Sequence, residues 1–172
     1  MMDAPVQAGR SVVVGPDGGD SFWQPVPANG FVRCILNSAA VGAQAPFSMG
    51  TQTVAPGAFV REHAHDAHDE LIYVLDGTGT VRLDGEDHAL APGAAVYLAA
   101  NSRHSFHAPP DAPLTYLWML MPGGLDTFFA AIGRPRTPGE PAPAPFPRPD
   151  DVAEIERRTV FGWTAQTQGP AS

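Results

Sequence analysis

Three histidines and a glutamate are the residues best suited to chemistry in this sequence of 172 residues. His63 and His65 stand two positions apart in a stretch that is expected to form a strand. Side chains two apart on a strand share one face, so both imidazoles can reach the same ion. Glu70 begins the next apolar run, where alternation puts Glu70, Ile72 and Val74 on one face. We therefore expect the carboxylate to point toward the same interior as the two imidazoles.

A fourth ligand is expected from a distant strand. His104 follows a turn that closes the apolar run 94–99, and it is the histidine best placed to return to the same interior. Three neutral imidazoles and one carboxylate suit a single divalent ion of iron, nickel, manganese, cobalt or zinc. Such a set leaves one or two coordination positions open, which is typical of a catalytic ion. The chain is thus predicted to hold one metal ion at His63, His65, Glu70 and His104.

The spacing of three of these ligands resembles the first sequence motif of the cupin family at every position. The motif runs from Gly57 through five residues to His63, then His65, four residues, Glu70, six residues and Gly77. The resemblance implies an all-β fold, the double-stranded β-helix or jelly-roll barrel. It also implies that these side chains bind a metal inside the barrel.

The second cupin motif is matched only in part. Gly93 and the metal histidine His104 are present, whereas Ala99, Asn101 and Ala108 stand where the motif has proline, glycine and asparagine. Asparagine tolerates the left-handed backbone that the glycine position needs. We therefore expect the turn before His104 to keep its shape.

Residues 121–133 resemble the tail of single-domain cupins of the quercetin 2,3-dioxygenase type. That resemblance implies that the metal binds a flavonol and that the glutamate acts as a base toward the flavonol hydroxyl. Glu70 would take this catalytic role. We expect burial beside Ile72 and Val74 to raise the pKa of Glu70 toward the working pH.

Strand parity gives five further candidates for substrate contact. They share a strand face with a predicted ligand or lie on the last barrel strand. A plain core position is an equally good interpretation for the aromatic ones, and solvent exposure in the predicted turn is favoured for His68. His88 lies in an Asp-Gly-rich hairpin and His107 has the opposite parity to His104, so we expect both at the surface. The five candidates are His68, Ile72, Phe106, Tyr116 and Trp118.

The elements that must position these residues are short strands separated by turns, a spacing typical of a sandwich or barrel. We expect one domain over 1–172, with an N-terminal arm over 1–30 around the β-like run Val12–Val14, a barrel over 31–121 and a tail over 122–172. Helical spacing predicts a short helix from Leu125 to Ile132. A proline-rich arm should follow over 133–149, and then a helix capped by Asp150, with the last ten residues loose. The predicted strands are 31–37, 46–55, 58–65, 69–76, 78–83, 86–90, 94–99, 103–107 and 113–121.

Composition limits the cellular compartments and the classes of binding partner that we expect. The formal net charge of −8 and the lack of a basic block argue against nucleic acid as a partner. The single cysteine, Cys34, is predicted to be a buried thiol in the core, and the lack of a second cysteine fits a reducing cytoplasm. No stretch reaches membrane-spanning length, and the first residues lack the pattern of a signal peptide. We expect a cytoplasmic protein, and the cupin resemblance implies a homodimer.

Three functions are consistent with these residues. The leading hypothesis is a metal-dependent dioxygenase that acts, with dioxygen, on a small phenolic, flavonol-like or enolisable substrate. The second is a redox-neutral isomerase, lyase or cyclase in which the ion acts only as a Lewis acid. The third is a cupin that binds a small molecule without catalysis. The cupin barrel hosts many chemistries, so the choice among them rests partly on analogy.

Overall fold

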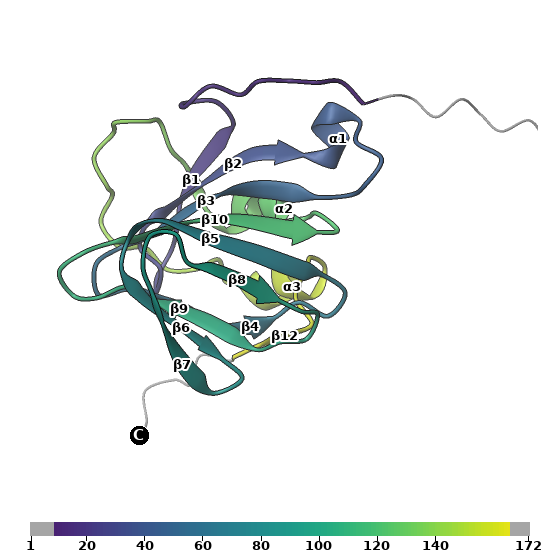
Figure 1. The fold of residues 1–172 in the computed structure, drawn as a ribbon. Helices are drawn as coiled ribbons and strands as arrows, with labels where there is room; N and C mark the ends of the chain where they lie inside the picture. The colour runs from purple at the N-terminus through teal and green to yellow at the C-terminus, as the bar shows by residue number, and fades with distance from the viewer. Residues whose placement is uncertain (1–8, 166–172) are drawn as a thin grey trace, which may run out of the picture.

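The computed structural model describes residues 9–165, and they fold mainly into two antiparallel β-sheets that lie face to face (Figure 1). One sheet has the strand order β11-β1-β2-β3-β10-β5-β8, and the other has the order β12-β4-β9-β6-β7. Strands that follow one another in sequence therefore often cross between the sheets, as in a jelly roll. The first strands are β1 (Asp20–Trp23), β2 (Phe31–Asn37), β3 (Ser48–Val54), β4 (Phe59–Ala64), β5 (Asp69–Gly77) and β6 (Gly79–Leu83). The remaining strands are β7 (Glu86–Leu90), β8 (Ala95–Leu98), β9 (His104–His107), β10 (Leu114–Met121), β11 (Arg134–Pro135) and β12 (Trp163–Thr164).

Alternate side chains of the central strands fill the space between the sheets. In β10, every second residue from Leu114 to Leu120 is buried. In β5, Glu70, Ile72 and Val74 are buried, whereas the residues between them are exposed on the outer face. This period of two is what a strand with one buried face produces. The inner face of β5 is therefore the face that carries Glu70, as the sequence predicts.

The predicted strands from residue 31 to residue 121 agree with the observed ones within two residues at each end. The N-terminal arm differs from the prediction. Val12–Val14 forms no strand, and the side chain of Val13 is 99% exposed. The strand of this arm is β1, which pairs with β2 and β11. A run of β-branched residues forms a strand only where a neighbour offers a ladder of hydrogen bonds, and β2 offers it to β1.

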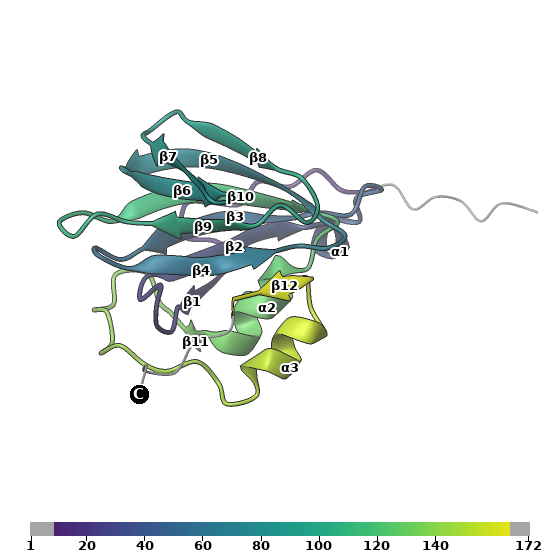
Figure 2. The ribbon, with the colours of Figure 1, turned by 90° about the horizontal axis from the view of Figure 1, so that it is seen from below.

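Within residues 9–165, three helices interrupt the strands: α1 (Ser38–Val41), α2 (Leu125–Ile132) and α3 (Val152–Arg157). The sequence predicts α2 at its observed bounds. For α3 the N-cap residue is Asp151, not the predicted Asp150, and its side chain makes no capping hydrogen bond. The proline-rich segment between α2 and α3 contains β11 and turns at 138–139 and 150–151, and its other residues belong to no helix or strand. Figure 2 shows α2 and α3 on one side of the two sheets, next to the edge strand β12.

The C-terminal segment is more ordered than the sequence suggests. Trp163 and Thr164 pair with Ala64 and His63 of β4, so this part of the predicted loose end extends a sheet. Residues 166–172 lie outside the described part of the chain. Within the described residues, no helix has the length and apolar character needed to cross a membrane.

The alternation in these strands predicts a large difference between two identical substitutions. Leu114 of β10 is 0% exposed in the core, whereas Leu75 of β5 is 45% exposed on the outer face. We expect Leu114→Ala to lower the free energy of unfolding by about 2–5 kcal/mol, and Leu75→Ala to lower it by less than about 1 kcal/mol. Urea unfolding of both variants measures the difference. Equal losses would contradict the assignment of the two faces.

Candidate metal centre

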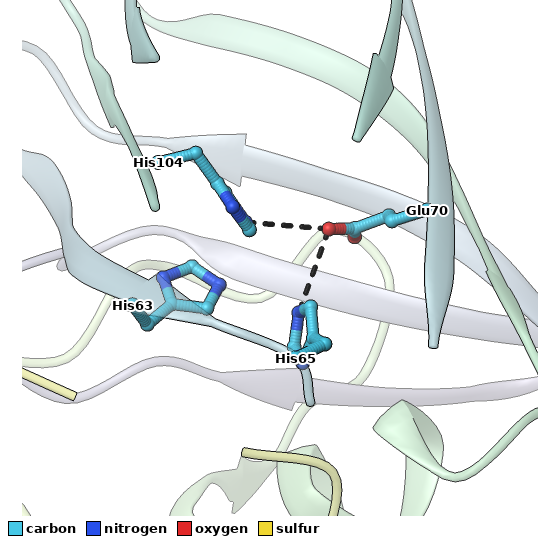
Figure 3. A group of neighbouring side chains, drawn as sticks. All are labelled: His63, His65, Glu70 and His104. Atoms are coloured by element: carbon cyan, nitrogen blue, oxygen red, sulfur yellow. Dashed lines mark ion pairs between the residues drawn. The ribbon is translucent and has the colours of Figure 1, made fainter. Parts of the chain in front are cut away.

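The predicted ligands come together inside the fold. One ligand atom from each of His63, His65, Glu70 and His104 lies within 4.8 Å of the others. Figure 3 shows the four side chains pointing toward a common centre, with Glu70 facing the histidines. Atoms that each lie about 2.0–2.2 Å from one ion are at most about 4.4 Å apart, so a small movement brings all four to binding distance. The grouping predicted from sequence is therefore confirmed as an arrangement of side chains.

Strand pairing explains why these distant residues meet. His63, on β4, is the direct partner of His104, the first residue of β9. Their ring centroids lie 4.1 Å apart. His65 follows the end of β4, and Glu70 enters from β5 in the opposite sheet. One sheet thus supplies the His63 and His104 imidazoles, and the other supplies the carboxylate.

Each imidazole is oriented by a hydrogen bond to a backbone carbonyl. The Nδ1 atoms of His63, His65 and His104 lie 2.8, 3.0 and 3.0 Å from carbonyl oxygens. A carbonyl can only accept, so each Nδ1 carries the proton and donates it. A neutral ring that is protonated at Nδ1 offers the lone pair of its Nε2 atom to a metal ion. Such a second contact is the usual way in which proteins orient metal-binding histidines.

The inward-facing atoms have no partner among residues 9–165. Nε2 of His65, Nε2 of His104 and Oε2 of Glu70 are all buried and form no hydrogen bond there. The two nitrogens lie 3.5 and 3.4 Å from that carboxylate oxygen. Buried polar atoms without partners are costly, and a cation would satisfy all three at once. The donor set therefore fits a divalent metal ion.

The electrostatics of the cluster favour the protonation states that a metal needs. Burial, together with the neighbouring His104 and His65, holds the pKa of His63 well below its ordinary value, so this ring stays neutral. Burial by itself raises the pKa of Glu70, but the adjacent imidazoles of His104 and His65 outweigh it and lower that pKa. The expectation of a raised pKa is therefore wrong. The two nearby imidazoles affect the pKa of Glu70 more than its apolar neighbours on β5 do, so the carboxylate stays ionised.

The turn before His104 keeps its shape despite the missing motif residues. Asn101 has a φ of +67°, which is the left-handed conformation predicted for it. Its backbone N–H donates to the carbonyl of His65 at 2.8 Å. Its side chain donates to the carbonyl of Asp66 at 3.3 Å. Asn101 thus links the loop that leads into His104 to the loop that contains His65.

Comparison with known proteins identifies the family. The cupin domain family matches residues 50–120, a stretch that contains all four ligands. The chain belongs to the cupins. Three of the four clustered side chains, His63, His65 and Glu70, belong to the first cupin sequence motif.

The cupin resembles proteins of polyketide biosynthesis over most of their length. It is 28% identical over 130 residues to the tetracenomycin polyketide synthase protein TcmJ of Streptomyces glaucescens, covering 72% of this chain and 78% of that protein. It is 30% identical over 131 residues to the polyketide synthase CurC of Streptomyces cyaneus, covering 64% of this chain and 84% of that protein.

Two further similarities support less: the first covers a small part of the relative, and the second shows a shared fold alone. A shorter stretch of 75 residues is 35% identical to quercetin 2,3-dioxygenase of Bacillus subtilis, which covers 43% of this chain and 22% of that enzyme. The solved structure of the polyketide cyclase RemF from Streptomyces resistomycificus superposes with a TM-score of 0.57 at 21% identity, covering 65% of this chain and 80% of that one. At that identity the superposition shows a shared fold.

An apolar cavity reaches the predicted metal site of this cupin. Phe106 and Tyr116, predicted as substrate contacts, line it together with His63 and Glu70. The other three candidates lie elsewhere. Ile72 and Trp118 are buried in the hydrophobic core, and His68 is a partly buried neighbour of His65 that does not line the cavity. His88 and His107 are exposed, as predicted.

Much of the cavity wall comes from the C-terminal segment, which sequence reasoning left without a site role. The carbonyl of Val160 accepts the hydrogen bond from Nδ1 of His65. The ring of Phe161 packs against His63 and His65 with centroids 5.3 and 5.1 Å away. The signal for these contacts in the sequence is the apolar pair Val160 and Phe161, which follows the polar run 156–159. Further lining residues that were not predicted are Gln52, Arg61, Leu125, Phe128, Phe129, Arg148 and Glu156.

Removing one ligand should abolish metal binding. We expect His104→Ala to lower the metal content of the purified protein roughly tenfold or more, because it removes one of four ligand atoms from a buried site. His88→Ala, at an exposed histidine, is the matched control and should keep the metal content of the parent. Elemental analysis measures both. Unchanged metal in His104→Ala would contradict the assigned ligand set.

Proposed function

We propose that this cupin is a metal-dependent, redox-neutral enzyme that cyclises an enolisable, polyketide-like substrate. The observation that carries the proposal is the similarity to TcmJ and CurC, which this chain matches over 78% and 84% of their lengths. That similarity favours the cyclase alternative over the dioxygenase that the sequence motifs first suggested. The match to quercetin 2,3-dioxygenase covers only 22% of that enzyme.

The proposed reaction is an intramolecular aldol condensation. A proton leaves a carbon between two carbonyl groups, that carbon bonds to a ketone carbon of the same molecule, and water is lost. The overall change needs neither an oxidant nor a reductant. A bound divalent ion would supply Lewis acidity toward the enolised oxygens.

Glu70 is the side chain best suited to accept the proton. It lines the cavity and is ionised, so it can accept a proton. Its lowered pKa makes it a weak base, so the Lewis acidity of a bound ion would have to acidify the substrate carbon. Tyr116 cannot replace it, because burial and the charge of Glu70 hold the pKa of its hydroxyl well above the ordinary value. Tyr116 instead donates a hydrogen bond to Gln52 at 3.1 Å, which fixes its ring in the cavity wall.

The apolar walls of the cavity would exclude water and favour a folded, unsaturated chain. Phe106 stacks near Tyr116 with ring centroids 4.7 Å apart, and Phe128 packs on Phe161 at 4.5 Å. Aromatic faces bind flat conjugated molecules through their large contact area. A dry site also strengthens the attraction between the ionised carboxylate and any positive charge nearby.

The dioxygenase stays as a second candidate, because a stretch of 75 residues of this chain is 35% identical to quercetin 2,3-dioxygenase. The two reactions differ in their need for dioxygen and in the mass of the product. A cyclisation removes water from the substrate, whereas a dioxygenase adds oxygen atoms to it.

The proposal predicts activity without dioxygen. We expect zinc-loaded protein to convert synthetic linear poly-β-ketones into dehydrated cyclic products at equal rates under air and under nitrogen. Glu70→Gln should lower the rate by about 100-fold or more, since it removes the base. His88→Ala is the control and should keep the rate of the parent protein. Mass spectrometry of the products decides the matter, and oxygen incorporation that requires air would contradict the cyclase.

A further inference from the structure

Three charged side chains form a cluster at the mouth of the apolar cavity. Arg61 comes from β4, Arg148 from the proline-rich segment and Glu156 from α3. All three line the inner cavity, and all three also line a wider groove outside it. The volumes are about 70 Å³ for the cavity and about 960 Å³ for the groove. A substrate that moves from the groove to the metal centre therefore passes these charges.

The cluster has more positive than negative charge. Glu156 accepts a hydrogen bond from Nη2 of Arg148 at 2.6 Å and is also paired with Nη2 of Arg61. Its single carboxylate faces two guanidinium groups, whose side chains are 15% and 13% exposed. Burial and the charge of Arg61 lower the pKa of Arg148, which reflects this excess. Partly buried positive charge of this kind is stabilised by a further anion.

Arg148 has the capacity to bind that anion. Among residues 9–165, Glu156 is the only side chain that accepts a hydrogen bond from Arg148, and the bond uses one Nη atom. A guanidinium has five N–H donors, so several remain directed elsewhere. Arg61 has fewer N–H donors left for a ligand, because its Nη1 atom also donates to the carbonyl of Ala165 at 2.7 Å.

We propose that Arg61 and Arg148 form an anion subsite that binds a carboxylate of the substrate where the cavity opens into the groove. In this arrangement Glu156 neutralises part of the positive charge while no substrate is bound. The inference rests on the proposed function, because it describes the substrate of the same site. It narrows that substrate to an enolisable molecule that carries a carboxylate several atoms from its reacting carbons.

A carboxylate suits this place because one is already held there. The carboxylate of Glu156 shows that the two guanidinium groups converge on a single oxygen. Its second oxygen accepts a hydrogen bond from Thr164 at 3.0 Å. Guanidinium and carboxylate groups match in charge and in planar geometry, and such bonds are among the stronger ones in proteins. The apolar walls nearby would bind the rest of the molecule.

The other interpretation is that the cluster only ties α3 to the barrel. Both interpretations predict that loss of Arg148 weakens the fold, so stability cannot separate them. Ligand binding can, because a purely structural cluster has no preference for an anionic ligand. Glu156→Gln is especially informative, since it keeps the size of the side chain and removes the internal competitor for the arginines.

The test measures binding to zinc-loaded protein by isothermal titration calorimetry. The ligands are 6-hydroxy-2-naphthoic acid, whose carboxylate lies across the two rings from its hydroxyl, the carboxamide of this acid and 6-hydroxy-2-naphthyl phosphate. We expect the acid to bind about tenfold more tightly than the neutral carboxamide. Arg148→Met should remove this preference. Arg157 is an exposed arginine in the outer groove. Arg157→Met makes the same change of charge and should keep the preference for the acid over the carboxamide.

Glu156→Gln should strengthen binding of the acid and leave binding of the carboxamide unchanged. Thermal unfolding of each variant shows that it is folded. Equal affinity for the acid and the carboxamide in the parent protein would overturn the proposal, and so would weaker acid binding in folded Glu156→Gln. Tighter binding of the phosphate than of the acid would also overturn it. None of these results depends on turnover, so the cyclase proposal is tested separately.

Discussion

The central constraint on this fold is that four metal-binding side chains must point into a dry interior without collapsing onto one another. Three imidazoles and a carboxylate in one buried space leave polar atoms without partners among residues 9–165, and a cation in that space would satisfy them. The backbone supports this arrangement by holding each Nδ1 atom on a carbonyl. The rings therefore cannot easily turn to find partners elsewhere.

Those carbonyls come from three different parts of the chain. The partners of His63 and His104 lie two residues before them, so the two strands orient their own ligands. The partner of His65 is Val160, which lies beyond α3. The C-terminal segment is thus part of the metal centre as well as a cover for the cavity. Any account of the chemistry has to include it.

The sequence predicted the barrel and the ligands well because both follow from local patterns. Alternation in β5 alone places Glu70 on the inner face, and the spacing of His63 and His65 alone places two imidazoles together. The left-handed turn at Asn101 is also a local property of asparagine. In each case, what one residue does depends on a few neighbours in the chain.

What the sequence did not predict depends on contacts between distant segments. The pKa of Glu70 depends on two imidazoles from another sheet and its adjoining loop, and burial alone suggests the wrong direction. Val12–Val14 has the composition of a strand but no partner, whereas β1 finds one. Phe161, Arg148 and Glu156 reach the cavity through a proline-rich segment whose path has no periodic signal. Ile72 and Trp118 have inward parity, but they lie deeper in the core than the cavity extends.

The central claim is that one divalent ion is held by these four side chains through the Nε2 atoms of the histidines. Anomalous diffraction from crystals of the zinc-loaded protein tests it most directly. The account predicts one strong peak about 2.0–2.2 Å from Nε2 of His63, His65 and His104 and from a carboxylate oxygen of Glu70. A peak bound elsewhere, or an ordered site from which the ring of His104 is turned away, would contradict it.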